Sequence, residues 1–308
     1  MPELPEVASL VEFLDERTAG RAVVAADVAS IAALKTFSPP VDALVGRRVA
    51  GVRRHGKWID VELAPGPDGT DDAGLHLLVH LSLGGWVRWS ATAPTGAVRP
   101  SLGGRSRGPA LALRVRLDDG SGFDLTEAGT RKRLAVHVVR AADDVPAVAS
   151  LGVDPLGPGF TPEVLARVLA ARNQQVKGAL RDQSAIAGIG NAYSDEILHA
   201  ARTSPFRMTR TYADDPAGVE ALHGAVRSVL AEAVAASSGK PAAELKDAKR
   251  RGMRVHGRTG QACPGWDGTP CGDVVHEVAF ADRSLQYCPT CQTGGRVLAD
   301  RRMSRLLR

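Results

Sequence analysis

The chain begins Met1-Pro2-Glu3-Leu4-Pro5-Glu6-Val7, and this stretch is the most informative part of the sequence. Removal of the initiator methionine, which is usual before a small residue, would leave a free secondary amine on Pro2. An α-amino group titrates at about 7.7–8.0, so part of the population is an unprotonated nucleophile near neutral pH. A secondary amine that attacks a sugar aldehyde carbon gives an iminium ion, which drives elimination of a neighbouring phosphate. The stretch therefore predicts covalent catalysis by Pro2, although many ordinary proteins also begin Met-Pro.

Apolar residues continue from this stretch at helical spacing and predict a helix from about residue 5 to 18. They are Leu4, Val7, Leu10, Val11 and Leu14. Such a helix places Pro2 and Glu3 at its positive N-terminal end, where carboxylates and phosphate groups are stabilised. Glu3 and Glu6 would complement the helix dipole in any protein, so the helix is compatible with a structural role as well as a catalytic one.

Length, charge and composition narrow the class of protein. The 308 residues suffice for two domains with a small appendage, and 44% hydrophobic residues support buried cores. A net charge of +5 and a pI near 9.2 favour a polyanionic partner. Aromatic residues, at 4%, are too scarce for a platform that stacks single-stranded bases. Since no apolar run approaches the ~20 residues that span a bilayer and the N-terminus is acidic, we expect a cytoplasmic protein without a membrane partner.

The chain divides into a β-rich part and a helical part. Strand-like patterns occupy 57–63, 75–81, 110–117 and 134–139, and loops rich in Gly, Pro and Asp occupy 64–74 and 91–109. Helices are predicted at 162–171, 175–181, 192–201 and 216–236. Residues 237–252 combine Ser, Gly and Pro with five basic side chains, and we interpret them as a basic flexible connection.

Four cysteines follow this connection and predict a structural zinc site. Cys288 and Cys291 form a Cys-x-x-Cys pair, whereas seven turn-rich residues separate Cys263 from Cys271. A cytoplasmic chain keeps thiols reduced, so a metal is favoured over disulfides. Four thiolates leave no open position for water, which indicates a closed structural site. His256 and His276 are alternative ligands.

Three further places carry residues suited to phosphate. Residues 182–198 predict a helix, a Gly188/Gly190 turn and a second helix with Asn191 as its N-cap, whose free N–H groups suit an anion. Lys57 opens a strand, and Arg283 lies five residues before Cys288 in a predicted hairpin. Each of these patterns also has a purely structural explanation. Residues 182–198 could be a capped helical core, Lys57 could lie at a solvated strand edge, and Arg283 could lie in a solvated turn.

Together these features resemble one family. The carriers are Pro2-Glu3-Leu4-Pro5-Glu6-Val7, Gly56-Lys57, Gly188-Ile189-Gly190-Asn191, and the four-cysteine finger with Arg283. In this order and spacing they resemble the formamidopyrimidine-DNA glycosylase/endonuclease VIII family of base-excision repair enzymes, over nearly the whole chain to about residue 292. The resemblance implies an α+β multidomain protein. Its expected parts are an N-terminal β-sandwich with an N-terminal helix (1–140), a helix–two-turns–helix domain (141–250), a zinc finger (251–292) and a basic tail (293–308).

The resemblance also implies a reaction, that of a DNA glycosylase with abasic-site lyase activity, which removes an oxidised base from a flipped-out nucleotide. By resemblance, Pro2 attacks C1′ of the sugar, releases the base and forms a Schiff base, and Glu3 is the general acid–base group. Lys57 and Arg283 match the residues assigned to β- and δ-elimination. The implied cofactor is one structural Zn²⁺, and the implied partner of a monomeric, nucleoid-associated enzyme is damaged double-stranded DNA.

DNA contacts are implied for Asn191, Leu83, Arg133 and Glu6, and here the chain departs from the family pattern. Leu83 stands where enzymes that excise 8-oxoguanine place Met, and Arg133-Leu134 stands where they carry Arg-Phe. These side chains fill the gap left by the flipped base. Residues 237–252 also lack the glycine- and threonine-rich base-pocket loop of those enzymes. The oxidised base therefore stays open, with a preference for oxidised pyrimidines or for single-stranded and bubble lesions as the alternative.

Two other interpretations remain. A non-catalytic damaged-DNA-binding protein would share the fold and the zinc, but it need not retain Pro2, Glu3, Lys57 and Arg283 together. Past the finger, residues 294–308 hold five arginines and one acid, which suits either a phosphate-contacting tail or a solvated one.

Overall fold

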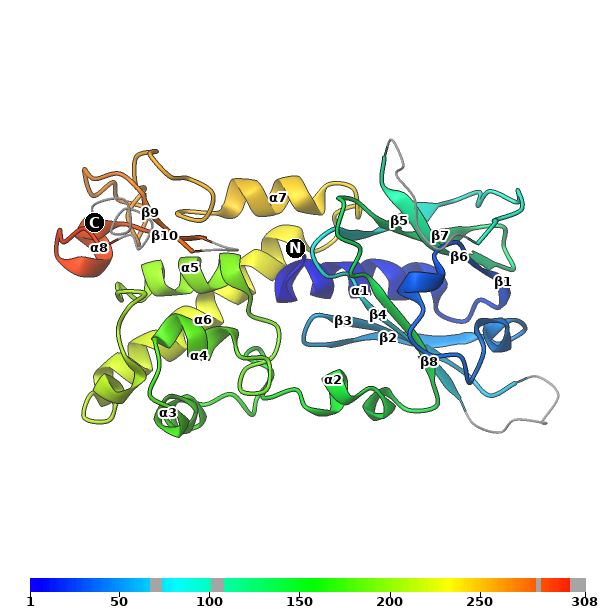
Figure 1. Cartoon of the computed structure of the whole chain (residues 1–308), viewed down its shortest axis with the longest axis horizontal. Coiled ribbons are helices and arrows are strands. Elements are labelled where there is room, and N and C mark those ends of the chain that lie inside the picture. Colours follow the sequence, from blue (N-terminus) through cyan, green and yellow to red (C-terminus); the bar gives the residue numbers. More distant parts are fainter. Residues whose placement is uncertain (67–73, 101–107, 281–283, 300–308) are drawn as a thin grey trace, which may run out of the picture. The chain divides into compact units, whose positions relative to one another are not determined.

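The computed structural model describes residues 1–66, 74–100, 108–280 and 284–299 (Figure 1). The chain forms two compact units. The first comprises residues 1–150 and 237–245, and the second comprises 151–236 and the chain from 246 onward. The finer domain limits expected from the sequence stay predictions.

The first unit opens with α1 (Leu4–Thr18), which confirms the predicted N-terminal helix. Leu4, Val7 and Leu10 are fully buried on its inner face. The helix packs against strand β2 (Val49–His55), where Asp15 Oδ1 accepts the Val52 N–H at 2.7 Å. The apolar residues that recur at helical spacing in the sequence therefore lie on the side of α1 that packs against the core.

Two four-stranded antiparallel sheets form the β-sandwich of this unit. One sheet has the order β1 (Val23–Val28), β6 (Ala110–Leu117), β7 (Gly122–Glu127), β5 (Gly85–Ser90). The other has the order β2, β3 (Trp58–Leu63), β4 (Leu75–His80), β8 (Ala135–Val139). Along β3, Ile59, Val61 and Leu63 enter the hydrophobic core, so the alternate residues lie on the opposite face of the sheet. Two short helices, η1 (Ile31–Ala33) and η2 (Val41–Leu44), connect β1 to β2. Two more, η3 (Ala142–Asp144) and α2 (Pro146–Ala149), follow β8.

The second unit is helical, as its sequence periodicity predicts. Its helices are α3 (Pro162–Ala171), α4 (Val176–Arg181), α5 (Asn191–Ala200), η4 (Thr209–Tyr212) and α6 (Pro216–Ser237). Thr161 caps α3, because its Oγ1 accepts the Val164 N–H at 3.3 Å. Within the described part of the chain, no helix is long and apolar enough to cross a membrane.

The expectation of a flexible connection at 237–252 is wrong over its second half. Helix α7 (Leu245–Gly252) forms there, with the Leu245 and Ala248 side chains buried. The first half is also held, since Ala242 and Leu245 join the core of the first unit and Trp86 Nε1 donates to the Ala242 carbonyl at 3.0 Å. The basic composition conceals these few apolar anchors, because the charged side chains lie on the exposed side of the helix.

The finger consists of the hairpin β9 (His276–Ala279) and β10 (Ser284–Tyr287), followed by the short helix α8 (Pro289–Thr293). Val278, Leu285 and Tyr287 form a small buried cluster in this hairpin. The Cys-x-x-Cys pair comes directly after β10, at the start of α8, a helix that the sequence analysis did not predict.

Candidate functional site

Residues 2–7, at the start of α1, are buried, whereas Met1 is exposed. Pro2 is buried, and Glu3 and Glu6 are 2% and 1% exposed. Glu6 Oε2 accepts the Glu3 N–H at 2.8 Å, and the Glu3 carbonyl accepts the Val7 N–H at 3.0 Å. The Glu6 carboxylate thus fixes the backbone beside Pro2 by half of a capping box. Its predicted contact with DNA stays a prediction.

Lys57 lies in the two-residue turn between β2 and β3, where Gly56 takes a φ of 56° that suits glycine. The Lys57 side chain is only 8% exposed. Burial, together with the positive charge of Lys57, lowers the pKa of His80 to about 4. His80 is therefore neutral near pH 7, and its ring lies 4.9 Å from that of Trp58. The structure places Lys57 beside a neutral imidazole at the end of β4.

Leu83 and Arg133 lie on two loops that are joined at their bases. The Ala128 N–H donates to the Gly84 carbonyl at 2.9 Å, and a Cβ at Gly84 would lie 2.2 Å from the Ala128 oxygen. Leu83 itself is 57% exposed, as a side chain that enters a gap in DNA would need to be. The close backbone approach explains the glycine after Leu83, and it makes the two loops one element.

A buried carboxylate holds the second of these loops. Glu127 is 4% exposed, and its Oε1 accepts the N–H groups of Arg133 at 2.6 Å and Leu134 at 2.9 Å. The Arg133 side chain is exposed, whereas Leu134 is 1% exposed and belongs to the core. Of the pair matched to Arg-Phe, only the arginine is presented to the surface.

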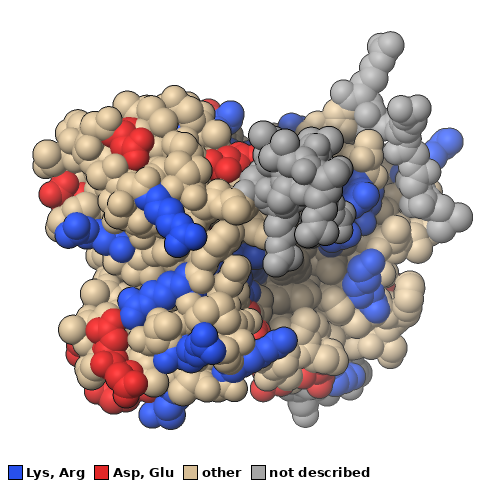
Figure 2. All heavy atoms as spheres, turned by 60° about the vertical axis from the view of Figure 1, so that its left-hand side comes forward, with Lys and Arg blue, Asp and Glu red and all other residues tan. Residues whose placement is uncertain are grey.

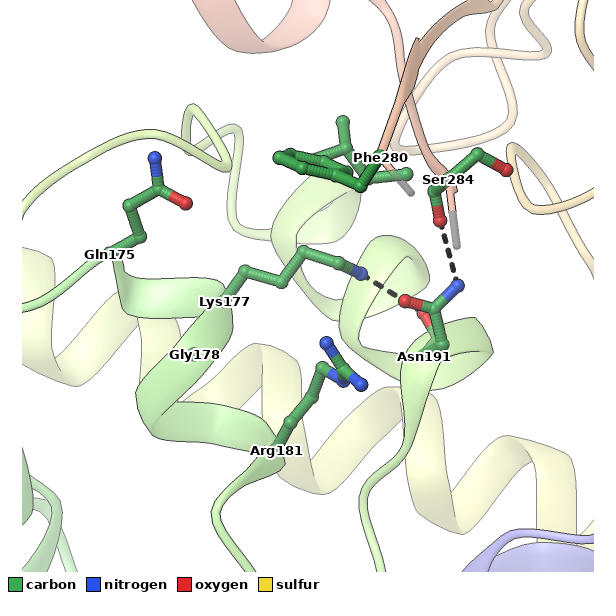
Figure 3. A pocket seen from close by; sticks show the side chains of 8 residues that line it. Gln175, Lys177, Gly178, Arg181, Asn191, Phe280 and Ser284 are labelled. Atoms are coloured by element: carbon green, nitrogen blue, oxygen red, sulfur yellow. Dashed lines mark hydrogen bonds between the residues drawn. The ribbon is translucent and has the colours of Figure 1, made fainter. Parts of the chain in front are cut away.

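A pocket lies at the start of α5 in the second unit, with about 400 Å³ of empty volume (Figure 3). Lys177 and Arg181 extend from α4 toward it. Asn191 is the first residue of α5, and Gly190 occupies the N-cap position, so the prediction of Asn191 as the N-cap is wrong by one residue. Its Nδ2 instead donates to the Ser284 carbonyl on β10 at 2.9 Å, which ties the helix to the finger hairpin.

Sequence reasoning missed the role of Lys177. Its ammonium donates to Asp195 Oδ1 at 2.6 Å, to Ser194 Oγ at 2.7 Å and to the Asn191 carbonyl at 3.1 Å. Both Lys177 and Asp195 are buried. The sequence shows only that a lysine occupies an inward position of a helix. It does not show which residue pairs with that lysine. The network fixes α4 against the first turns of α5.

Two neighbouring acids of α5 hold the chain that leads into the finger. Glu196 accepts three backbone N–H groups, from Arg254, Val255 and His256, at 2.7 to 3.0 Å. Burial raises the pKa of Glu196, an effect that these hydrogen bonds oppose. His256 Nδ1 lies 2.8 Å from Asp195 Oδ2. His256 therefore pairs with a carboxylate of α5 and lies outside the cysteine cluster.

The four cysteines gather as the sequence predicts. Cys263, Cys271, Cys288 and Cys291 have their sulfur atoms within 4.8 Å of one another. Two of the separations are 3.9 Å (Cys263 to Cys291) and 3.5 Å (Cys271 to Cys288). Sulfurs that bind one tetrahedral zinc at about 2.3 Å are about 3.8 Å apart, so the cluster fits this ion. Neither His256 nor His276 belongs to the cluster.

The wide spacing between Cys263 and Cys271 is closed by a tight turn. Gly265 has a φ of 79°, and a Cβ on it would lie 1.9 Å from the Thr269 oxygen. The only residue that permits this approach is glycine. The seven intervening residues therefore fold back, and both sulfurs reach the cluster.

A histidine of α5 lies directly behind the cysteines. His199 is fully buried, and its Nε2 lies 3.3 Å from Cys263 Sγ. Its Nδ1 is buried without a hydrogen-bond partner in the described part of the chain. Burial, with a smaller effect from Arg254, lowers the pKa of His199 to about 4. The neutral ring is therefore arranged to donate its Nε2–H to the sulfur.

Two of the predicted features fall outside the described residues: Arg283 and the end of the basic tail, 300–308. Figure 2 shows Lys and Arg at several separate places on the visible face, with Asp and Glu between them. The distribution agrees with the moderate net charge of +5.

Comparison with known proteins assigns the chain to a family. Residues 1–135 match the model of the formamidopyrimidine-DNA glycosylase N-terminal domain, and residues 151–243 match that of its H2TH domain. A formamidopyrimidine-DNA glycosylase of Paracoccus denitrificans is 35% identical over 307 residues, which cover 95% of this chain and all of the relative. The chain belongs to the formamidopyrimidine-DNA glycosylase family.

Other members of the family support this assignment. An uncharacterized formamidopyrimidine-DNA glycosylase-like protein of Mycobacterium tuberculosis is 53% identical over 163 residues, 53% of this chain and 98% of the relative. Among solved structures, a complex of the Lactococcus lactis Fpg with DNA that contains an abasic site shares the fold, with a TM-score of 0.76 and 21% identity. It aligns over 94% of this chain and 99% of the solved one. The family fold thus extends over both units.

Proposed function

We propose that this family member is a bifunctional enzyme, a DNA glycosylase with abasic-site lyase activity, which excises oxidised bases from double-stranded DNA through the amine of Pro2. The observation that carries the proposal is the placement of Pro2 and Glu3 at the buried start of α1 in a chain of this family. An amine at the positive end of a helix is biased toward its neutral, nucleophilic form. The glycosylase assignment follows the family, and the lyase step is the part that needs a test.

The proposed chemistry begins with the attack of the Pro2 nitrogen on C1′ of the damaged nucleotide. The bond from C1′ to the base breaks and the base leaves with the electron pair. Opening of the sugar ring between C1′ and its oxygen converts the adduct to an iminium ion. Loss of a 2′ proton then converts the iminium ion to a neutral enamine. The electron pair of the enamine expels the 3′ phosphate and leaves a conjugated iminium ion. Glu3 is the acid–base group beside Pro2 that would move the protons of these steps.

Cationic groups would hold the phosphates that flank the damage. In the first unit, we propose that Lys57 binds a flanking phosphate and takes part in the elimination step. In the second unit, the pocket at the start of α5 is suited to phosphate, because Arg181 and the positive end of the helix converge there. Lys177 pairs with Asp195, and Arg181 is a second cationic side chain that lines this pocket. Contacts of this kind make affinity for duplex DNA fall steeply with salt.

One zinc ion would be held by Cys263, Cys271, Cys288 and Cys291. Burial raises the pKa of the Cys263 and Cys291 thiols, and a dication would favour their deprotonated forms. Since four thiolates complete the coordination of zinc, the ion would stabilise the finger and take no part in the chemistry. The hairpin that follows the first cysteines carries Ser284, which contacts Asn191. Zinc would thereby support the phosphate pocket as well.

Borohydride trapping on a duplex with a single abasic site tests the lyase step. Reduction of the iminium ion should give a stable protein–DNA adduct with the wild-type chain. The adduct should be absent with Pro2→Gly and with a chain that retains Met1. Pro162→Gly, the same substitution at the first position of α3, is the matched control and should trap normally. No adduct from the zinc-loaded wild-type protein, or full trapping by Pro2→Gly, would contradict the proposal.

A further inference from the structure

A second group of metal-binding side chains lies on the first unit, far along the chain from the cysteines. We call it the Asp60 cluster, and it comprises His55 on β2, Asp60 and Glu62 on β3, and His76 on β4. Three neighbouring strands therefore contribute to it. In register, Glu62 pairs with His76, and Asp60 pairs with Leu78 on β4. The cluster lies on the sheet face opposite the hydrophobic core, because Ile59 and Val61 take the inner positions of β3.

Asp60 is the centre of the cluster. His55 Nε2 lies 2.9 Å from Asp60 Oδ2, and His76 Nδ1 lies 3.0 Å from Asp60 Oδ1 and 3.1 Å from Oδ2. The Glu62 carboxylate completes a group with Asp60 and His76 in which the three ligand atoms lie within 4.8 Å of one another. One imidazole nitrogen and two carboxylates thus point to one small volume, and His55 contacts Asp60 beside this group.

Burial makes this arrangement unusual. The Asp60 side chain is 0% exposed, while those of His55 and His76 are 32% and 22% exposed. A buried carboxylate is costly unless a positive charge compensates it. Arg53 is the nearby arginine, but its Nε pairs with Glu62 Oε1 at 3.0 Å and its side chain is 70% exposed. Asp60 itself has two imidazoles as its partners, and these are neutral ligands when a metal is bound.

We propose that the Asp60 cluster binds a divalent transition metal ion, with Zn²⁺ as the representative ion. Imidazole nitrogen and carboxylate oxygen together suit zinc and its neighbours in the first transition row, whereas Mg²⁺ and Ca²⁺ prefer oxygen alone. Ligand atoms about 2.0–2.2 Å from a tetrahedral zinc are about 3.4 Å apart. The nitrogen-to-oxygen distances of 2.9 to 3.1 Å in the cluster are slightly shorter. Entry of the ion thus requires the side chains to part by only a few tenths of an ångström.

Such an ion would replace the protons that now lie between the imidazoles and Asp60. It would also cross-link β3 and β4 immediately behind the Gly56-Lys57 turn, since Trp58 at the start of β3 follows this turn directly. The site is chemically different from the cysteine cluster, because it holds no sulfur. Its affinity should fall as the pH falls, as protons compete for the imidazoles.

Zinc counting on the whole, zinc-loaded protein tests the site. After equilibration with excess Zn²⁺ and gel filtration, the wild-type chain should retain two zinc ions. His76→Gln and Asp60→Asn should each retain one, and calorimetric titration should show at least a tenfold loss of affinity for the second ion. His76→Gln removes a partly exposed ligand, so it remains informative where Asp60→Asn does not fold.

His137→Gln is the matched control, because His137 lies on β8 of the same sheet but has no contact with Asp60. It should retain two ions and the wild-type affinity. Cobalt substitution adds a second readout, since only the cysteine cluster gives sulfur-to-cobalt charge-transfer absorption. One zinc per wild-type chain would overturn the proposal. Two ions in both His76→Gln and Asp60→Asn would overturn it equally.

Discussion

Lys177 Nζ lies 2.6 Å from Asp195 Oδ1, and the two side chains are 7% and 0% exposed. This buried ion pair joins α4 to α5, two helices that line the pocket proposed to bind phosphate. Water cannot replace either partner once the other is removed. The stability of the second unit should therefore depend strongly on the pair.

Lys177→Met should destabilise the protein by about 3–5 kcal/mol, because it leaves the Asp195 carboxylate buried without its cation. Urea denaturation followed by circular dichroism measures this change. Arg250→Met is the control: its ion pair with Asp247 has the same 2.6 Å separation, but the side chains are 79% and 58% exposed. An exposed pair contributes only about 0–1 kcal/mol. Equal losses from the two substitutions would refute the assignment.

His199→Phe should weaken zinc retention, because the Cys263 sulfur loses the hydrogen bond from Nε2. Loss of such a supporting contact typically costs about 10–100-fold in metal affinity. The rate of zinc transfer to a chromogenic chelator measures the effect. His223→Phe is the control, since His223 bonds the Phe160 carbonyl at 3.0 Å and contacts no cysteine. Unchanged zinc transfer from His199→Phe would show that the contact has no supporting role.

His80 should make the protein less stable as the pH falls from about 6.5 toward 4. Its pKa is about 4 in the folded chain and near 6.5 as a free side chain, so the unfolded state binds more protons in this window. The contribution of His80 to the free energy of unfolding is therefore largest above pH 6.5 and is lost as the pH approaches 4. It amounts to at most about 3 kcal/mol at 1.36 kcal/mol per pKa unit. His80→Gln should flatten the stability profile across this window.

Lys57→Gln tests the origin of the same shift. Since the positive charge of Lys57 is the smaller of the two causes, its removal should raise the pKa of His80 partway toward 6.5. Titration of the His80 ring by NMR gives the value directly. A pKa that does not move would mean that Lys57 and His80 do not lie together as described.

Arg181→Gln should reduce the salt dependence of binding to a damaged duplex. Loss of one phosphate contact lowers the slope of log K against log salt by about 0.9. Fluorescence anisotropy at several salt concentrations measures the slope. Arg167→Gln removes an exposed arginine of α3 that does not line the pocket, and it should leave the slope unchanged. The same slope for Arg181→Gln and the wild type would exclude Arg181 from phosphate binding.

The sequence predicts those features that arise from local patterns. Apolar spacing gives α1 and the helices of the second unit, and cysteine spacing gives the cluster that is suited to zinc. The chemistry proposed for Pro2 and Glu3 also comes from the sequence, because it depends on the two residues that follow Met1.

The features that sequence reasoning missed arise from contacts between segments that are distant in the chain. Glu196 is unremarkable until three N–H groups from 254–256 meet it. Asn191 is a residue type that is typical of an N-cap, but the helix begins one residue earlier than expected. The Asn191 side-chain amide donates a hydrogen bond to the Ser284 carbonyl instead. Helix α7 was hidden by its basic residues, since only the buried Leu245 and Ala248 show that it packs.

The most direct test of the account is the position of the covalent bond to DNA. After borohydride reduction on an abasic-site duplex and digestion with nuclease and protease, mass spectrometry locates the modified residue. We expect a single sugar remnant on the α-nitrogen of Pro2, in a peptide that lacks Met1. A remnant on Lys57 or on any other lysine, with the N-terminal peptide unmodified, would contradict it.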